Sequence, residues 1–150
     1  MPDQSPVPEP SASPDSSASP ERSCAADLAV NQPDVALIFE GGGMRNSYTA
    51  GMVQVLLERN LNFGRVYGIS AGSSHTVNYL SRDIPRARAS FTDLVKYPNF
   101  GGWGSFLRGR GYFNSPYLYE DLIVNAPEGD VMAFDWDTFA ANPADFHIEA

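Results

Sequence analysis

The 150-residue sequence has one cysteine and two histidines, and each shortage excludes a class of protein. With Cys24 alone, the chain can form neither an internal disulfide nor a cysteine-based metal site. No other ligand spacing typical of a metal site is present, so we expect no metal and no cofactor. No apolar run is long enough to span a bilayer, and the N-terminus lacks the basic start and apolar core of a signal peptide. The sequence therefore predicts a cytoplasmic protein.

Positive charge is also scarce. The chain has 10 lysines and arginines against 18 aspartates and glutamates, a formal net charge of −8. Because proteins that bind nucleic acid need a basic patch or stripe, this balance excludes nucleic acid as a partner. The oligomeric state is left open by the sequence.

The N-terminal segment is poor in residues that build a core. Its first 23 residues hold 6 of the 12 prolines and 7 serines, with Val7 as the only large aliphatic residue. Such a segment buries too little apolar surface to offset the entropy lost on ordering. We therefore expect a disordered, Pro/Ser-rich acidic tail over residues 1–33 and a folded domain over residues 34–150.

The folded part opens with a strand and a glycine-rich turn. Residues 35–39 are almost continuously apolar, which favours a central parallel strand covered on both faces. Gly41, Gly42 and Gly43 follow it, and without Cβ atoms they let a substrate oxygen come close to backbone N–H groups. This turn is a candidate anion cradle.

A helix is expected after this turn, beginning at Asn46 or Ser47 and running to Asn60. Its predicted apolar stripe consists of Tyr48, Met52, Val55 and Leu56, widened by Val53 and Leu57. The glycine turn would then lie at a helix N-terminus, where free N–H groups and the macrodipole favour negative charge.

A second glycine-rich turn surrounds Ser70. A short strand over residues 65–69 leads into it, and a helical segment follows to about Leu80. Gly68 and Gly72 lie two residues on either side of Ser70, where side chains would collide as the chain reverses. Strand, sharp turn and helix form a nucleophile elbow, so Ser70 is a candidate nucleophile.

Together the two turns resemble those of the patatin-like phospholipases, serine lipid acyl hydrolases of α/β fold. The resemblance rests on residues 40–45 (EGGGMR) and 68–72 (GISAG), with further similar segments at residues 83–88, 102–103 and 134–136. It covers the chain from about Val35 to its end, and implies a parallel central sheet flanked by helices in three layers.

The same resemblance implies roles for the residues of both turns. Ser70 would be the nucleophile, the backbone of Gly41, Gly42 and Gly43 with Arg45 nearby would form the oxyanion hole, and Gly68 and Gly72 would shape the elbow. The substrate would be a carboxylic ester of a lipid, which adds peripheral contact with a membrane to the expected cytoplasmic location.

The sequence departs from the family pattern in two places. Asn46 stands where the family has the last glycine of G-G-G-x-R-G, which we expect to be tolerated because Asn adopts left-handed backbone more easily than most residues. The family's Ser–Asp dyad takes its Asp from a downstream Asp-Gly motif, and this chain has no Asp-Gly pair. The chain ends at Ala150 within an alternating run that predicts a strand just begun, so we expect the domain to be incomplete at its C-terminus.

Two functional hypotheses therefore remain: a serine lipid acyl hydrolase, or a catalytically incomplete fragment that acts at most as a binding module. His75 is expected on a different face of its helix from Ser70, at a polar position. His147 comes last in the chain, but Asp135, Asp137 and Asp145 all lie too near it in sequence for a relaxed triad. A dinucleotide-binding module is disfavoured, because its third glycine is replaced by Asn46 and the next strand ends at Ser70.

The remaining segments are expected to be scaffold. Asp83 should cap a helix that Pro85 enters, another short helix should begin at Ser115, and Asp135 should cap a third. The glycine-rich, aromatic segment over residues 97–119 has two interpretations: an apolar lid with cationic points for lipid headgroups, or a crossover whose aromatics cover the sheet edge.

Overall fold

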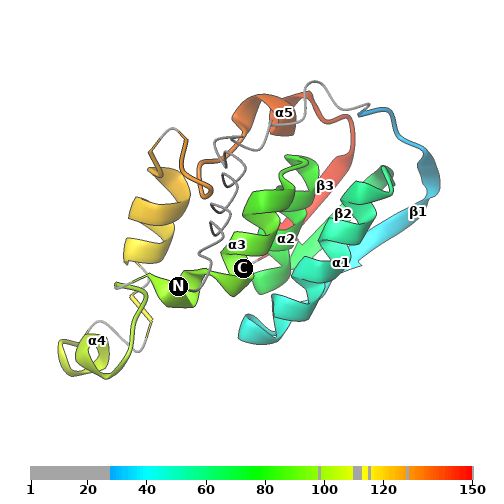
Figure 1. The fold of residues 1–150 in the computed structure, drawn as a ribbon. Coiled ribbons are helices and arrows are strands. Elements are labelled where there is room, and N and C mark those ends of the chain that lie inside the picture. The colour runs from blue at the N-terminus through cyan, green and yellow to red at the C-terminus, as the bar shows by residue number, and fades with distance from the viewer. Residues whose placement is uncertain (1–27, 98, 110–112, 115, 128, 150) are drawn as a thin grey trace, which may run out of the picture.

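The computed structural model describes residues 28–97, 99–109, 113–114, 116–127 and 129–149. Its three strands, β1 (Gln32–Phe39), β2 (Phe63–Ile69) and β3 (Asp145–Glu149), form one parallel sheet in the order β1-β2-β3 (Figure 1). β1 begins two residues before the predicted domain boundary, and the amides of Asn31 and Gln32 both donate to the Asn62 carbonyl. Most of the predicted tail, residues 1–27, lies outside the described residues.

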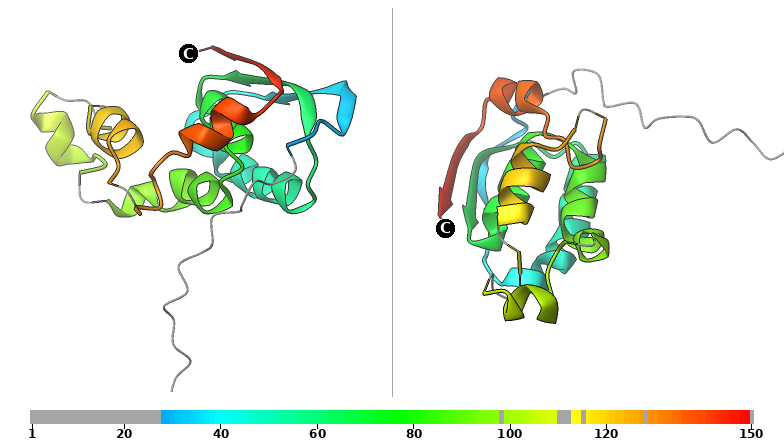
Figure 2. Two further views of the ribbon diagram at one scale, coloured as in Figure 1. Left: turned by 90° about the horizontal axis from the view of Figure 1, so that it is seen from above. Right: turned by 90° about the vertical axis from the view of Figure 1, so that its left-hand side faces the viewer.

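Helices α1 (Ser47–Glu58), α2 (Ala71–Leu80) and α3 (Ile84–Thr92) lie together on one face of the sheet (Figure 2). The predicted α/β fold, a parallel sheet flanked by helices, is therefore confirmed. In the described part of the chain the opposite face of the sheet is open, with Ile38 63 %, Tyr67 38 % and Ile69 48 % exposed. The sheet and one helical layer of the expected three-layer arrangement are thus in place.

The position predicted for the first strand differs from the one observed. Among the described strands β2 is central and β1 lies at an edge, and only Phe39 of β1 is fully buried. An apolar run reports the tendency of a strand to be buried, but it does not report how many neighbours the strand has.

The core lies between the sheet and the three helices. Val66 of β2 packs there with Val53 and Leu57 of α1 and with Tyr79 and Leu80 of α2.

The predicted stripe of α1 was wrong in part. Ala50, Val53 and Leu57 are its buried residues, whereas Tyr48 is 86 % and Met52 63 % exposed. Apolar residues surround almost the whole helix, so their spacing did not determine which face packs.

The two predicted Asp caps are both present. The Asp83 carboxylate accepts the Arg86 N–H at 2.9 Å at the start of α3. The Asp135 carboxylate accepts the Thr138 N–H at 2.9 Å at the start of α5 (Trp136–Ala141).

Between α3 and α5 lie three short helical segments and a second small core. The segments are the 3₁₀ turn η2 (Leu94–Lys96), the helix α4 (Trp103–Leu107) and the π-helical η3 (Tyr117–Val124). Ala89, Leu122 and Met132 form the small core. The predicted start of a helix at Ser115 lies outside the described residues, and η3 occupies the segment that follows. Among the described helices, none has both the length and the hydropathy that a membrane span requires.

Candidate active site

Ser70 forms the turn between β2 and α2. Its backbone has φ 52° and ψ −123°, a left-handed conformation that non-glycine residues seldom adopt, and its side chain is exposed. Two hydrogen bonds hold this turn: the Ser70 N–H donates to the Glu149 carbonyl at 2.7 Å, and the Ser73 N–H donates to the Ser70 carbonyl at 2.9 Å. A strained backbone of this kind persists only where surrounding contacts enforce it, and such strain is concentrated at functional sites.

The two glycines that flank Ser70 are required by close packing. A Cβ at Gly68 would lie 2.3 Å from Oγ1 of Thr76, and a Cβ at Gly72 would lie 2.1 Å from the Phe39 carbonyl oxygen. The start of α2 is therefore pressed directly against the end of β1. The predicted geometry of the elbow, strand to sharp turn to helix, is present.

The first glycine turn lies beside Ser70. A Cβ at Gly41 would be 3.1 Å from the Ser70 Cβ, so the two turns touch at the carboxyl edge of the sheet. The chain then passes through Gly42 at φ 152° into the 3₁₀ turn η1 (Gly43–Asn46). The N–H groups of Gly43 and Met44 begin this turn, so they have no partner within it. The guanidinium of Arg45 folds back toward Gly42, with Nε and Nη2 each 3.4 Å from a Cβ placed there.

The Asn46 side chain hydrogen-bonds to the backbone of the glycine turn. Asn46 is almost fully buried, with 3 % of its surface exposed. With its amide oxygen toward Gly42, it accepts the Gly42 N–H at 3.2 Å and donates to the Glu40 carbonyl at 3.2 Å. Its backbone is right-handed, at φ −65° and ψ −4°. The left-handed tolerance invoked from the sequence is therefore not the reason that Asn fits here.

His75 is buried beneath Asn46 and is not the polar helix position expected from the sequence. Its Nε2 lies 2.9 Å from the Asn46 carbonyl oxygen, and its ring stacks on Phe91 at 4.0 Å. Burial lowers the pKa of His75 to about 4, so the ring is neutral at pH 7 and its Nε2–H donates to Asn46. The sequence showed no signal for this contact, because it joins residues 29 positions apart.

No carboxylate among the described residues hydrogen-bonds the Ser70 hydroxyl. The Asp135 carboxylate is used by Thr138, whose N–H and hydroxyl it accepts at 2.9 and 2.8 Å. Asp145 lies opposite Arg65 in the register of β2 and β3. Arg65 comes four residues before the end of β2, so Asp145 lies about 13 Å along the strand from the Ser70 turn. His147 lies opposite Tyr67, with Nε2 3.0 Å from Oε1 of Glu149. Among the described residues, neither histidine hydrogen-bonds the Ser70 hydroxyl.

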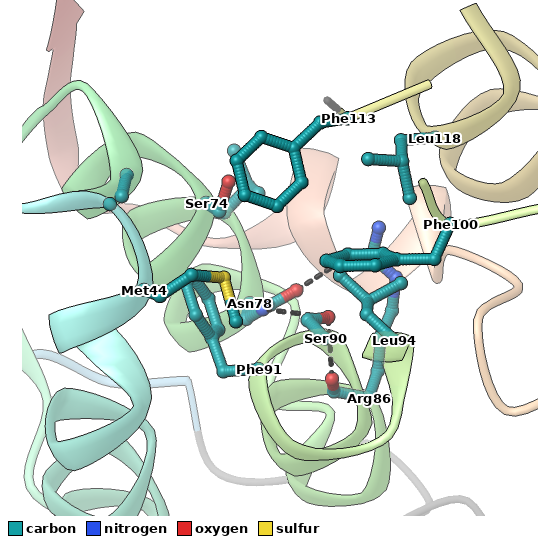
Figure 3. A pocket seen from close by; sticks show the side chains of 13 residues that line it. Met44, Ser74, Asn78, Arg86, Ser90, Phe91, Leu94, Phe100, Phe113 and Leu118 are labelled. Carbon is teal, nitrogen blue, oxygen red and sulfur yellow. Dashed lines mark hydrogen bonds between the residues drawn. The ribbon is translucent and has the colours of Figure 1, made fainter. Parts of the chain in front are cut away.

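A cavity of about 280 Å³ adjoins both turns. Gly43 and Met44 of the first turn line it together with Ala71, the residue after Ser70, and Ser74 (Figure 3). No group of three or more possible metal ligands lies in this or any other part of the chain that the structure describes.

The aromatic segment contributes to the cavity in part. Phe100 and Phe113 line it and contact each other edge to face at 5.4 Å. Trp103 and Phe106 of α4 remain 73 % and 55 % exposed. Both interpretations of the segment therefore stay open.

A known family model matches most of the chain. The family model described as "Patatin-like phospholipase" matches residues 37–145, which include both turns, all of β2, the end of β1 and the first residue of β3. Neither the comparison with curated proteins nor that with solved structures found a match. Because the family model matches most of the sequence, the chain belongs to the patatin-like phospholipase family.

Proposed function

We propose that the protein is a serine acyl hydrolase that acts on carboxylic esters of lipids, with Ser70 as its nucleophile. The observation that carries this proposal is the strained, exposed Ser70 turn, which touches the glycine turn and adjoins a largely apolar cavity. Membership of the family supports lipid ester hydrolysis as the general activity.

In the proposed reaction, Ser70 Oγ attacks the ester carbonyl carbon and its proton passes to a base. The carbonyl oxygen then carries a negative charge, which backbone N–H groups stabilise. Collapse of this intermediate breaks the bond to the alcohol, and water later releases the acyl group from Ser70.

Among the three glycines proposed for the oxyanion hole, the donor role falls to Gly43. The Gly42 N–H is directed to the Asn46 side chain, whereas Gly43 and Ala71 line the same cavity. Gly41 supplies the close approach to Ser70, and Arg45 places a positive charge beside the loop. The N–H of the residue after the nucleophile is a common second donor, and here that residue is Ala71.

The exposed apolar side chains of α4 are proposed to contact the lipid surface. Trp103, Phe106 and Leu107 are each more than half exposed, and Arg108 follows them. Aromatic residues beside a basic residue suit the interface between a membrane and water.

A second candidate function is a binding module without turnover. It is favoured by one observation: the described residues place no carboxylate on the Ser70 hydroxyl, and a serine hydroxyl is a weak nucleophile until a base accepts its proton.

Labelling with a fluorophosphonate separates the two candidates. The hydrolase proposal predicts one phosphonate per chain, located on Ser70 by peptide mass spectrometry, with none in Ser70→Ala. Ser74→Ala is the matched control, because Ser74 lines the same cavity one turn further along α2. Absence of any adduct on Ser70 would leave the binding module as the better account.

A further inference from the structure

Arg86 of α3 is a buried cation whose guanidinium contacts neutral groups. Its side chain is 3 % exposed. Nε donates to the Met132 carbonyl at 3.0 Å, Nη1 donates to Oδ1 of Asn78, and the guanidinium lies 4.8 Å from the centre of the Phe134 ring.

Among the described residues, no carboxylate forms an ion pair with the Arg86 guanidinium. Two ion pairs seen in the described part of the chain, Lys96 with Asp93 and His147 with Glu149, do not involve Arg86. The charge that acts on Arg86 is that of Asp83, whose Oδ1 accepts the backbone N–H of Arg86 as the helix cap. Burial lowers the pKa of Arg86 more than this neighbour raises it. A buried charge is costly unless an opposite charge pairs with it.

Arg86 also lines the cavity beside the two turns. Figure 3 shows its side chain rising from α3 behind Phe100, with its end directed toward Leu118. Asn78, Ser90 and Arg86 form a polar wall, while Phe91, Leu94 and Leu118 are apolar. Asn78 follows Ser70 by eight residues on α2, which corresponds to about 12 Å at the rise of a helix. The cavity thus has apolar sides, an end next to Ser70, and a cationic end remote from it.

We propose that this cavity is a subsite for an ester substrate whose acyl chain carries an anionic group, a carboxylate or a phosphate, with Arg86 as the specificity-determining residue. The inference rests on the proposed function in that it places the ester at Ser70. The anion would accept hydrogen bonds from the guanidinium, and such charge-assisted bonds are stronger than neutral ones. A purely structural Arg86, one that only joins α2, α3 and the Met132 segment, would give no preference for charged ligands.

The test compares ligands that differ in one charge. Monomethyl suberate has an ester at one end and a carboxylate at the other, whereas dimethyl suberate has two neutral ends. Binding to the full chain is measured by calorimetry in the Ser70→Ala background, so that turnover does not interfere. The half-ester should bind on the order of tenfold or more tightly than the diester, as one charge-assisted bond implies. Octyl phosphate serves as the phosphate probe, and whichever anion binds more tightly identifies the source of the charge.

Two substitutions on α3 make the comparison specific. Arg86→Gln should remove the preference for the charged ligand, while Arg88→Gln, an exposed arginine two residues further along, should keep it. Equal binding of half-ester and diester, or no binding of either, would overturn the proposal. Because no reactive serine is needed, this outcome is independent of the phosphonate labelling of Ser70.

A second variant tests the role of Arg86 in binding the anion if Arg86→Gln does not fold. Ser90 is four residues after Arg86 and lines the same wall, so Ser90→Asp would place a carboxylate on the guanidinium's side of the helix. This variant should unfold at a higher temperature than the parent and should lose the preference for the half-ester. An unchanged preference in Ser90→Asp would contradict a role for Arg86 in binding the anion.

Discussion

The stability of the fold should fall in mildly acidic solution because His75 is buried in its neutral form. Unfolded histidine has a pKa near 6.5, whereas burial lowers that of His75 to about 4. Above pH 6.5 the ring is neutral in both states, so pH has no effect through this group. Between these two values only the unfolded state binds the proton, and the free energy of unfolding decreases as the pH falls. Below the folded pKa both states bind the proton and the decrease ends.

The size of this loss of stability follows from the difference between the unfolded and folded pKa values of His75. Each pH unit in which only the unfolded state is protonated costs about 1.4 kcal/mol, so the window down to about pH 4 corresponds to a loss of about 3 kcal/mol. This is a large share of the stability of a domain of this size.

The assay is urea unfolding followed by circular dichroism at pH 7, 6, 5 and 4.5. His75→Gln keeps a donor for the Asn46 carbonyl but does not titrate, so its stability should depend less on pH than that of the parent. His147→Gln is the control, since His147 is exposed and contacts Glu149. If the parent and His75→Gln lose the same free energy between pH 6.5 and 4.5, His75 is not buried as a neutral ring.

Three further outcomes are expected. Gly72→Ala should prevent folding or lower the thermal midpoint sharply, because its Cβ would lie 2.1 Å from the Phe39 carbonyl oxygen. The control is Gly51→Ala on α1, where no atom lies within 4 Å of the added Cβ. Similar midpoints for the two variants would show that the turn at Ser70 is loosely packed. Asn46→Ala should slow phosphonate labelling of Ser70 at least tenfold, because the glycine turn loses the hydrogen bonds of the Asn46 side chain to Gly42 and Glu40. Labelling at the parental rate would show that the turn keeps its conformation without Asn46. Deleting residues 1–23 should leave the thermal midpoint unchanged, since that segment has almost no side chains that pack, and a clear drop would show that the tail contributes to the fold.

Local patterns in the sequence predicted the strand–turn–helix geometry around Ser70 and the two Asp caps. Gly68, Ser70 and Gly72 are close in sequence, and the steric requirement at each position is set by the turn itself. Asp83 and Asp135 cap helices through contacts three residues away. Patterns of this kind need no knowledge of the rest of the chain.

Long-range packing was predicted less well. The face that α1 buries depends on what lies against it, and an almost fully apolar helix carries little information about that. His75 contacts the Asn46 carbonyl 29 positions away, and Arg86, which was expected to be scaffold, contacts the Met132 carbonyl 46 positions away. The one signal available for Asn46 was its place within the glycine motif, where a buried amide replaces the family's glycine.

The most direct test of Ser70 as the nucleophile is to detect an acyl group on it. The chain and its Ser70→Ala variant are incubated with p-nitrophenyl butyrate, quenched with acid, and digested for mass spectrometry. The account predicts a butyryl adduct on the peptide that contains Ser70, absent from the variant. Turnover should be far below that of hydrolases whose serine contacts a base, because no described carboxylate reaches the hydroxyl. An adduct on another residue, or none on Ser70 while Ser70-independent hydrolysis proceeds, would contradict the assignment of the nucleophile.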